Sequence, residues 1–445
     1  MHLRRRATAI VAAMVAATAV GVSGAVALPA KPADPQPGGS ATPRAVPAAG
    51  TFYPTDASRL LGSPDSGYAL EPGPGVTVPA AGVGSVPSTG VSAVVVNVLA
   101  VAGAADAGLS LGPVSSPTAA PLLVAPAGTT RSALLTIPLA AAGAIRLSAS
   151  APATVTVDLV GFYAADDTVV ASQGVSGGYQ PVDVSRILDT DATGQPLAAG
   201  ARQVLEVDLG SAATPHTTAV LVRATATGAT AAGTLTMGPA DGPAVPSVPF
   251  AAGVTAANLA LVPARVGASG RLDLVLTNAS SGPTGVRLDL VGFYDDGALG
   301  PNLRFRALPQ TRVLDTATGV GAPALPPGAR TTVTPDDAVV GDSTFALVGV
   351  ATAKSTAPSD LDVGAAGVRA TTRSVDLAAG TTTLPVQVEV GADRTLGLRA
   401  GSGGALTSVT LDVTGSFEAY PSVANPAARG WVAPVSGWQV SASPR

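Results

Sequence analysis

Three copies of one short motif, each at a nearly constant distance from an upstream arginine, most constrain how this chain folds. The motif reads Val-Thr-Val-Asp-Leu-Val-Gly-Phe-Tyr at 155–163, Val-Arg-Leu-Asp-Leu-Val-Gly-Phe-Tyr at 286–294 and Val-Thr-Leu-Asp-Val-Thr-Gly-Ser-Phe at 409–417. An arginine followed by two aliphatic residues precedes each copy, so that arginine and motif aspartate stand at 59 and 158, 186 and 289, and 312 and 412. This spacing predicts one module copied three times.

The repeat is too long for a solenoid or propeller unit of about 20–50 residues, which cannot bury a core alone. Its length matches a single domain of about 100–150 residues. We therefore expect three modules in series, like beads on a string, with short polar joints that let neighbours touch. The predicted modules span 51–165, 178–296 and 303–420.

Within each module apolar and polar residues alternate, as in 92–98, 218–224 and 271–276. This period is typical of strands. Clusters of Gly, Pro, Ser and Asn separate the runs about every ten residues, which is the spacing of a sandwich or barrel. Alanine is abundant, but no caps frame a helical pattern. The sequence predicts an all-β protein of three tandem antiparallel β-sandwich-like repeat domains.

The first residues have the pattern of an export signal. Three arginines at 4–6 precede an apolar run, and Ala25-Val26-Ala27 supplies a small-x-small cleavage pattern. We expect a signal peptide at 1–27 cleaved after Ala27, with Ala30 as the alternative and an uncleaved membrane anchor as the competing interpretation. The protein is then secreted to the extracellular space or the cell wall.

Two further segments lie outside the modules. Residues 28–50 are rich in Pro, Ala and Gly and read as a linker. Residues 421–445 form a C-terminal tail with both tryptophans, Trp431 and Trp438. Three interpretations of the tail stay open: packing onto module three, an exposed aromatic recognition segment, and disorder.

Composition narrows the partners. The chain has no cysteine, which excludes disulfides and thiolate chemistry. Its net charge of −4 becomes −7 once the three signal arginines are removed. An acidic chain lacks the basic footprint needed for nucleic acid or anionic lipids. We expect no nucleic acid partner, no cofactor, and no membrane contact after signal cleavage.

Taken together, the motifs resemble the β-rich repeats of secreted and cell-surface proteins from high-GC Gram-positive (actinobacterial) bacteria. The residues that match are Arg186 to Thr190, Asn258 to Pro263, Asp289 to Tyr294, Val94 to Val98, Asp158 to Tyr163 and Arg312 to Thr316. The resemblance implies surface or wall-associated accessory modules and says little about chemistry. Module one departs from the pattern, because Gly62-Ser63 stand where Asp-Thr belongs.

Catalytic residue types are scarce. After signal removal His216 is the one histidine left, and its Thr-Pro-His-Thr-Thr context predicts an exposed loop. A glycosidase needs two acids across a cleft. The adjacent pairs at 166–167, 295–296 and 336–337 read instead as solvated turns. We expect the motif aspartates to face solvent or a sheet edge.

The candidate ligand or turn positions are Asp189, Asp191, Asp315, Trp431 and Trp438. Asp189 and Asp191 lie as at the start of a calcium loop, but the glutamate expected at position twelve is replaced by Gly200. The competing interpretation is that Asp189 and Asp315 accept backbone N–H bonds in turns and contact nearby arginines.

These observations predict a protein that is not an enzyme: an exported structural or adhesive protein of the cell surface or extracellular space. Its partners would be cell-wall polysaccharide or other surface proteins. The alternative is a cell-wall or carbohydrate-binding protein with an aromatic groove near Trp431 or Trp438. A secreted hydrolase, with two acids converging from different strands, is the third hypothesis.

Overall fold

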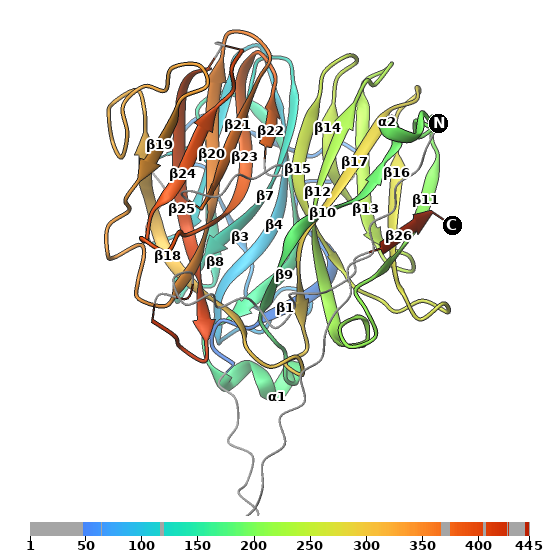
Figure 1. Ribbon diagram of the computed structural model, residues 1–445, viewed down its shortest axis with the longest axis vertical. Coiled ribbons are helices and arrows are strands. Elements are labelled where there is room, and N and C mark those ends of the chain that lie inside the picture. The colour runs from blue at the N-terminus through green and yellow to red at the C-terminus, as the bar shows by residue number, and fades with distance from the viewer. Residues whose placement is uncertain are drawn as a thin grey trace, which may run out of the picture. The chain divides into compact units, whose positions relative to one another are not determined.

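The computed structural model describes residues 48–444 except 64, 116–119, 366–373, 404–405, 425 and 427–440. Regular structure in this part of the chain is almost entirely β, and the named strands pair antiparallel in five sheets (Figure 1). The prediction of an all-β, β-sandwich-like fold is confirmed. Short helical turns occupy η1 (Asp167–Val169), α1 (Val170–Gln173), α2 (Thr190–Thr193) and η2 (Thr214–His216).

The strands fall into three consecutive segments. The first segment holds β1 (Phe52–Leu61), β2 (Tyr68–Leu70), β3 (Val76–Pro79), β4 (Val91–Ala102), β5 (Ala107–Pro113), β6 (Leu123–Ala125), β7 (Thr130–Pro138), β8 (Ala144–Ala149) and β9 (Ala153–Ala164). The second holds β10 (Tyr179–Asp189), β11 (Arg202–Asp208), β12 (Thr217–Thr227), β13 (Gly233–Pro239), β14 (Val245–Phe250), β15 (Ala256–Pro263), β16 (Leu272–Asn278) and β17 (Gly285–Asp295). The third holds β18 (Asn302–Asp315), β19 (Arg330–Val333), β20 (Thr344–Ser355), β21 (Ser359–Ala365), β22 (Ser374–Leu377), β23 (Gly380–Glu389), β24 (Leu396–Ala400) and β25 (Leu406–Tyr420).

Strand order is the same in all three segments. One sheet, here called the inner sheet, runs β1-β9-β4-β7, β10-β17-β12-β15 and β18-β25-β20-β23 in turn. The other, the outer sheet, runs β3-β8-β5-β6, β11-β16-β13-β14 and β19-β24-β21-β22. A pairing of Tyr179 with Leu303 joins the second and third inner sheets into one eight-stranded sheet. In each segment the motif strand is therefore central and the arginine strand lies beside it.

The tail returns to the second segment. Its last described strand, β26 (Ser441–Pro444), pairs antiparallel with β11 and adds a fifth strand to that outer sheet (Figure 1). Trp431 and Trp438, on which the three interpretations of the tail depended, lie outside the described residues.

The inner strands are buried on both faces, which explains their continuous apolar runs. In β4, Val94, Val96 and Val98 pack into the core between the two sheets of the first segment. Ala93 and Val95 point the other way, into a second core formed by all three segments. The second segment repeats this alternation in β12, where Val220 and Val222 face their own core and Leu221 the shared one.

The shared core changes the expected organisation. Beads on a string would each bury one core and leave the far side of each inner sheet to solvent. Here those far sides pack together, and residues Pro47–Arg445 form one compact unit. The expectation of separate beads is wrong because apolar residues cover both faces of every inner sheet, and a strand of this kind requires a partner on each side.

Candidate functional site

The arginine and the motif aspartate of each segment are direct neighbours across two antiparallel strands. The paired residues are Arg59 with Asp158, Arg186 with Asp289 and Arg312 with Asp412. In each pair the guanidinium binds both carboxylate oxygens, with Nε–Oδ1 distances of 2.5, 2.8 and 3.1 Å. This fork geometry is the strong form of a charge-assisted hydrogen bond.

These aspartates do not face solvent, and that prediction is wrong. Their side chains are 7, 5 and 4% exposed. A carboxylate is stable at such a position only when a cation and hydrogen bonds replace its water. The arginine on the neighbouring strand supplies both. The repeated spacing between arginine and aspartate is therefore the spacing of a salt bridge.

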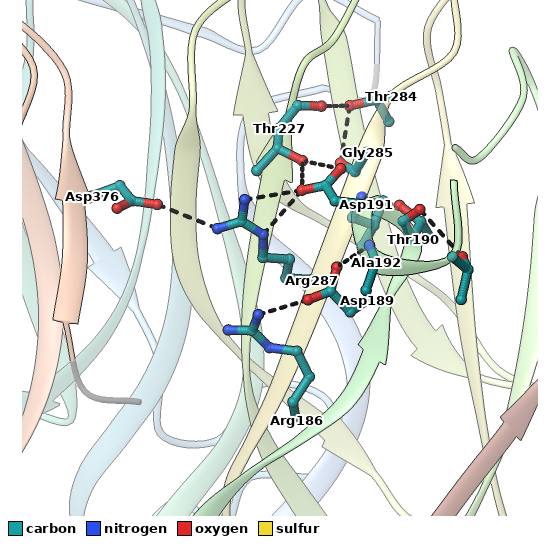
Figure 2. Close-up of polar contacts among 12 residues, drawn as sticks. Arg186, Asp189, Thr190, Asp191, Ala192, Thr227, Thr284, Gly285, Arg287 and Asp376 are labelled. Atoms are coloured by element: carbon teal, nitrogen blue, oxygen red, sulfur yellow. Dashed lines mark hydrogen bonds and ion pairs between the residues drawn. The ribbon is translucent and has the colours of Figure 1, made fainter. Parts of the chain in front are cut away.

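The turn after the second arginine holds two candidate ligand residues (Figure 2). Asp189 caps α2 by accepting the Ala192 N–H at 3.0 Å and also binds Arg186 Nη1 at 2.8 Å. Burial alone would raise the pKa of Asp189, but the Ala192 N–H and the Arg186 guanidinium outweigh it and lower that pKa. The third segment repeats the arrangement, since Asp315 accepts the Ala317 N–H at 3.0 Å and binds Arg312 Nη1 at 3.2 Å.

Asp191 points away from Asp189. Its carboxylate accepts the Thr227 hydroxyl at 2.8 Å and the Arg287 Nε at 3.0 Å (Figure 2). Arg287 in turn reaches Asp376 of the third segment at 3.6 Å. The two carboxylates that suggested a calcium loop are thus directed to different cations. Within the described ranges, no cluster of three or more His, Asp or Glu residues is placed to hold a metal ion.

The adjacent acid pairs do not behave alike. Asp295 is fully buried and accepts bonds from the backbone of Gly178 and Gly297 and from Gln180 Nε2. Burial raises the pKa of Asp295 against the lowering effect of these bonds. The prediction of a solvated turn is therefore wrong for Asp295, because the loops around it supply donors in place of water. Its neighbour Asp296 is half-exposed and contacts His216 Nδ1 at 3.0 Å, at the end of η2.

Sequence reasoning missed the residues at the centre of the shared core. An aromatic ring opens each inner sheet: Phe52, Tyr179 and Phe305, at the same distance before the three arginines. Each packs against the last ring of the motif in the next segment, and the third segment closes on the first. The centroid distances are 4.2 Å for Phe52–Tyr294, 4.8 Å for Tyr179–Phe417 and 4.2 Å for Phe305–Tyr163.

The motif glycine makes room for these rings. A Cβ at Gly161 would lie 2.2 Å from Phe52, one at Gly292 2.1 Å from the Tyr179 hydroxyl, and one at Gly415 2.2 Å from Phe305. These separations are far below any van der Waals contact, so each position admits only glycine while the ring stays in place. The fixed distance of an aromatic residue before each arginine was the signal that could have revealed this contact.

A pocket of about 950 Å³ lies where the three segments meet near the start of β7. Its wall comes from residues 128–131 of the first segment, 232–234 and 250–255 of the second, and 358–359 and 376–379 of the third. Arg131 and Asp376 are the charged residues of this lining. No sequence motif pointed here, because the wall is assembled from loop ends far apart in the chain.

No family model and no curated protein matches the chain. Two solved structures show a distant likeness. One is described as the triple jelly roll fold and turret assembly in an archaeal virus, with 9% identity, 83% of this chain and 90% of that chain covered, and a TM-score of 0.16. The other is Sulfolobus Turreted Icosahedral Virus, with 9% identity, 82% and 91% covered, and a TM-score of 0.15. Such low TM-scores establish no relation to either.

Among the described residues, no helix has the length and apolar character needed to cross a membrane.

Proposed function

We propose that this is an exported, non-catalytic structural protein of the cell surface or extracellular space. It consists of three tandem β-sandwich-like repeats that close around a common aromatic centre. The observation that carries the proposal is the use of the motif itself. Its aspartate, glycine and last ring each take part in an internal contact, and they do so in all three segments.

The repeat interpretation rests on topology as well as on sequence. The three segments share one strand order in both sheets. Their opening rings contact the closing rings in a cycle from first to second, second to third and third to first. A cyclic set of equivalent contacts is how three like subunits close a ring. We interpret the chain as such a trimer with its subunits joined end to end.

A hydrolase is disfavoured by the fate of its candidate acids. Glycoside hydrolysis needs two carboxyl groups facing each other across a substrate cleft. Asp158, Asp289 and Asp412 are each bound to an arginine inside a sheet. Asp295 is buried while Asp296 points to His216, so this pair does not converge either.

The second candidate function is a cell-wall or carbohydrate-binding protein. The pocket among the three segments favours it, because pockets of about 300–1,000 Å³ are of the size that takes small ligands. Binding at that pocket and a structural role are compatible, since the pocket uses none of the motif residues.

Export and wall binding can be tested together in a Gram-positive host. We expect the protein in the medium or wall fraction, with an N-terminus at Leu28 or Lys31. Retention in the cytoplasm would contradict export. Purified full-length protein and a form ending at Tyr420 are then incubated with peptidoglycan and wall polysaccharides. Retention of neither form supports the structural function, and binding lost with the tail would favour the second candidate.

A further inference from the structure

Arg131 differs from the motif arginines in having no carboxylate bound to it within the described part of the chain. Its side chain is half-buried at the start of β7, and its Nη1 donates to the carbonyl of the adjacent Thr130 at 3.0 Å. Burial lowers the pKa of Arg131, and no neighbouring charge is named as opposing that effect. A guanidinium that has lost water without gaining an anion is a site where an anionic ligand gains binding energy.

The second charged residue of the pocket does not neutralise it. Asp376 faces Arg287 at 3.6 Å, and Arg287 also binds Asp191. The carboxylate of Asp376 is therefore shared with a cation outside the pocket lining. Arg131 is left as the uncompensated charge of the wall described here.

The rest of the wall is polar in a particular way. Hydroxyls of Thr130, Thr234, Thr255 and Ser359 line it, and two buried apolar side chains, Phe250 and Leu377, contribute to it. Neutral hydroxyl groups suit a ligand that itself carries many hydroxyls. A phosphate or sulfate ester would ordinarily recruit more than one cation.

We propose that this pocket binds a small acidic saccharide, with the sugar carboxylate on the Arg131 guanidinium and the sugar hydroxyls on the threonine and serine side chains. The assignment extends the second candidate function to a particular site and ligand class. It does not depend on export, so failure of the export experiment would leave it standing.

The test is calorimetric titration of the full-length secreted chain with glucuronic acid, with glucose and acetate as the neutral and the hydroxyl-free probes. We expect saturable binding of glucuronate and at least about tenfold weaker binding of glucose and acetate. Acetate binding as tightly as glucuronate would overturn the saccharide assignment. Absence of saturable glucuronate binding would overturn the site.

Three variants locate the binding. Arg131→Gln should weaken glucuronate binding by at least about tenfold, toward the value for glucose. Arg202→Gln, which changes an exposed arginine on β11, should leave it unchanged. Ala251→Trp, at an exposed residue of the pocket wall, should block binding by filling the space while the protein keeps its thermal transition. Unchanged affinity in both Arg131→Gln and Ala251→Trp would refute the proposal.

Discussion

Adding one methyl group at the motif glycine should cost more stability than most surface changes of any size. In Gly292→Ala the new Cβ would stand 2.1, 2.3 and 2.5 Å from three atoms of the Tyr179 ring. That ring is 1% exposed and stacks on Phe417, so it cannot swing into solvent. Overpacking of this kind costs about 1–3 kcal/mol. Displacing the Tyr179 hydroxyl from the Val291 carbonyl, 2.9 Å away, adds about 1 kcal/mol.

Urea unfolding followed by far-ultraviolet circular dichroism measures the loss. We expect Gly292→Ala to lower the free energy of unfolding by about 3 kcal/mol. Gly103→Ala is the matched control, because its Cβ would meet its nearest neighbour, the Pro152 carbonyl oxygen, at 3.4 Å. The double change Tyr179→Leu with Gly292→Ala should be less harmful than the sum of the single changes, since the ring is gone. A loss no larger than in Gly103→Ala, or strict additivity, would refute the reasoning.

Three other predictions concern charges and the tail. Arg186→Met leaves Asp289 buried without its cation and should cost about 3 kcal/mol, whereas Arg186→Met combined with Asp289→Leu should regain most of it; equal losses would contradict a buried pair. Because the pKa of Asp295 is raised in the folded state, this group lowers stability as pH rises above the ordinary aspartate range. Asp295→Asn should therefore gain stability relative to the natural protein between about pH 4 and its folded pKa, and a pH-independent difference in urea titrations would contradict this. A chain ending at residue 440 lacks β26, so amide hydrogen exchange in β11 should quicken while that in β3 does not change.

The all-β class could be predicted from the sequence because alternation and turn residues are local signals. The cyclic packing could not be predicted, because the same apolar run in β4 suits a strand buried against one sheet or between two. Only the contacts of Ala93 and Val95 with the shared core decide between these arrangements.

The chemistry of the repeated residues shows a similar division. Asp289 lies among apolar residues, and alternation alone assigned it to solvent or a sheet edge. Its burial depends on Arg186 lying opposite it in register, which is a long-range fact. The axial pocket is harder still, since Arg131, Thr255 and Asp376 come from three segments that only tertiary packing brings together.

The central claim is that the three repeats fold as one unit around the shared aromatic core. Differential scanning calorimetry of the full-length secreted chain tests it most directly. We expect one transition whose van't Hoff enthalpy equals its calorimetric enthalpy. Three resolved transitions, or a van't Hoff enthalpy of about one third of the calorimetric value, would show independent modules and contradict the account.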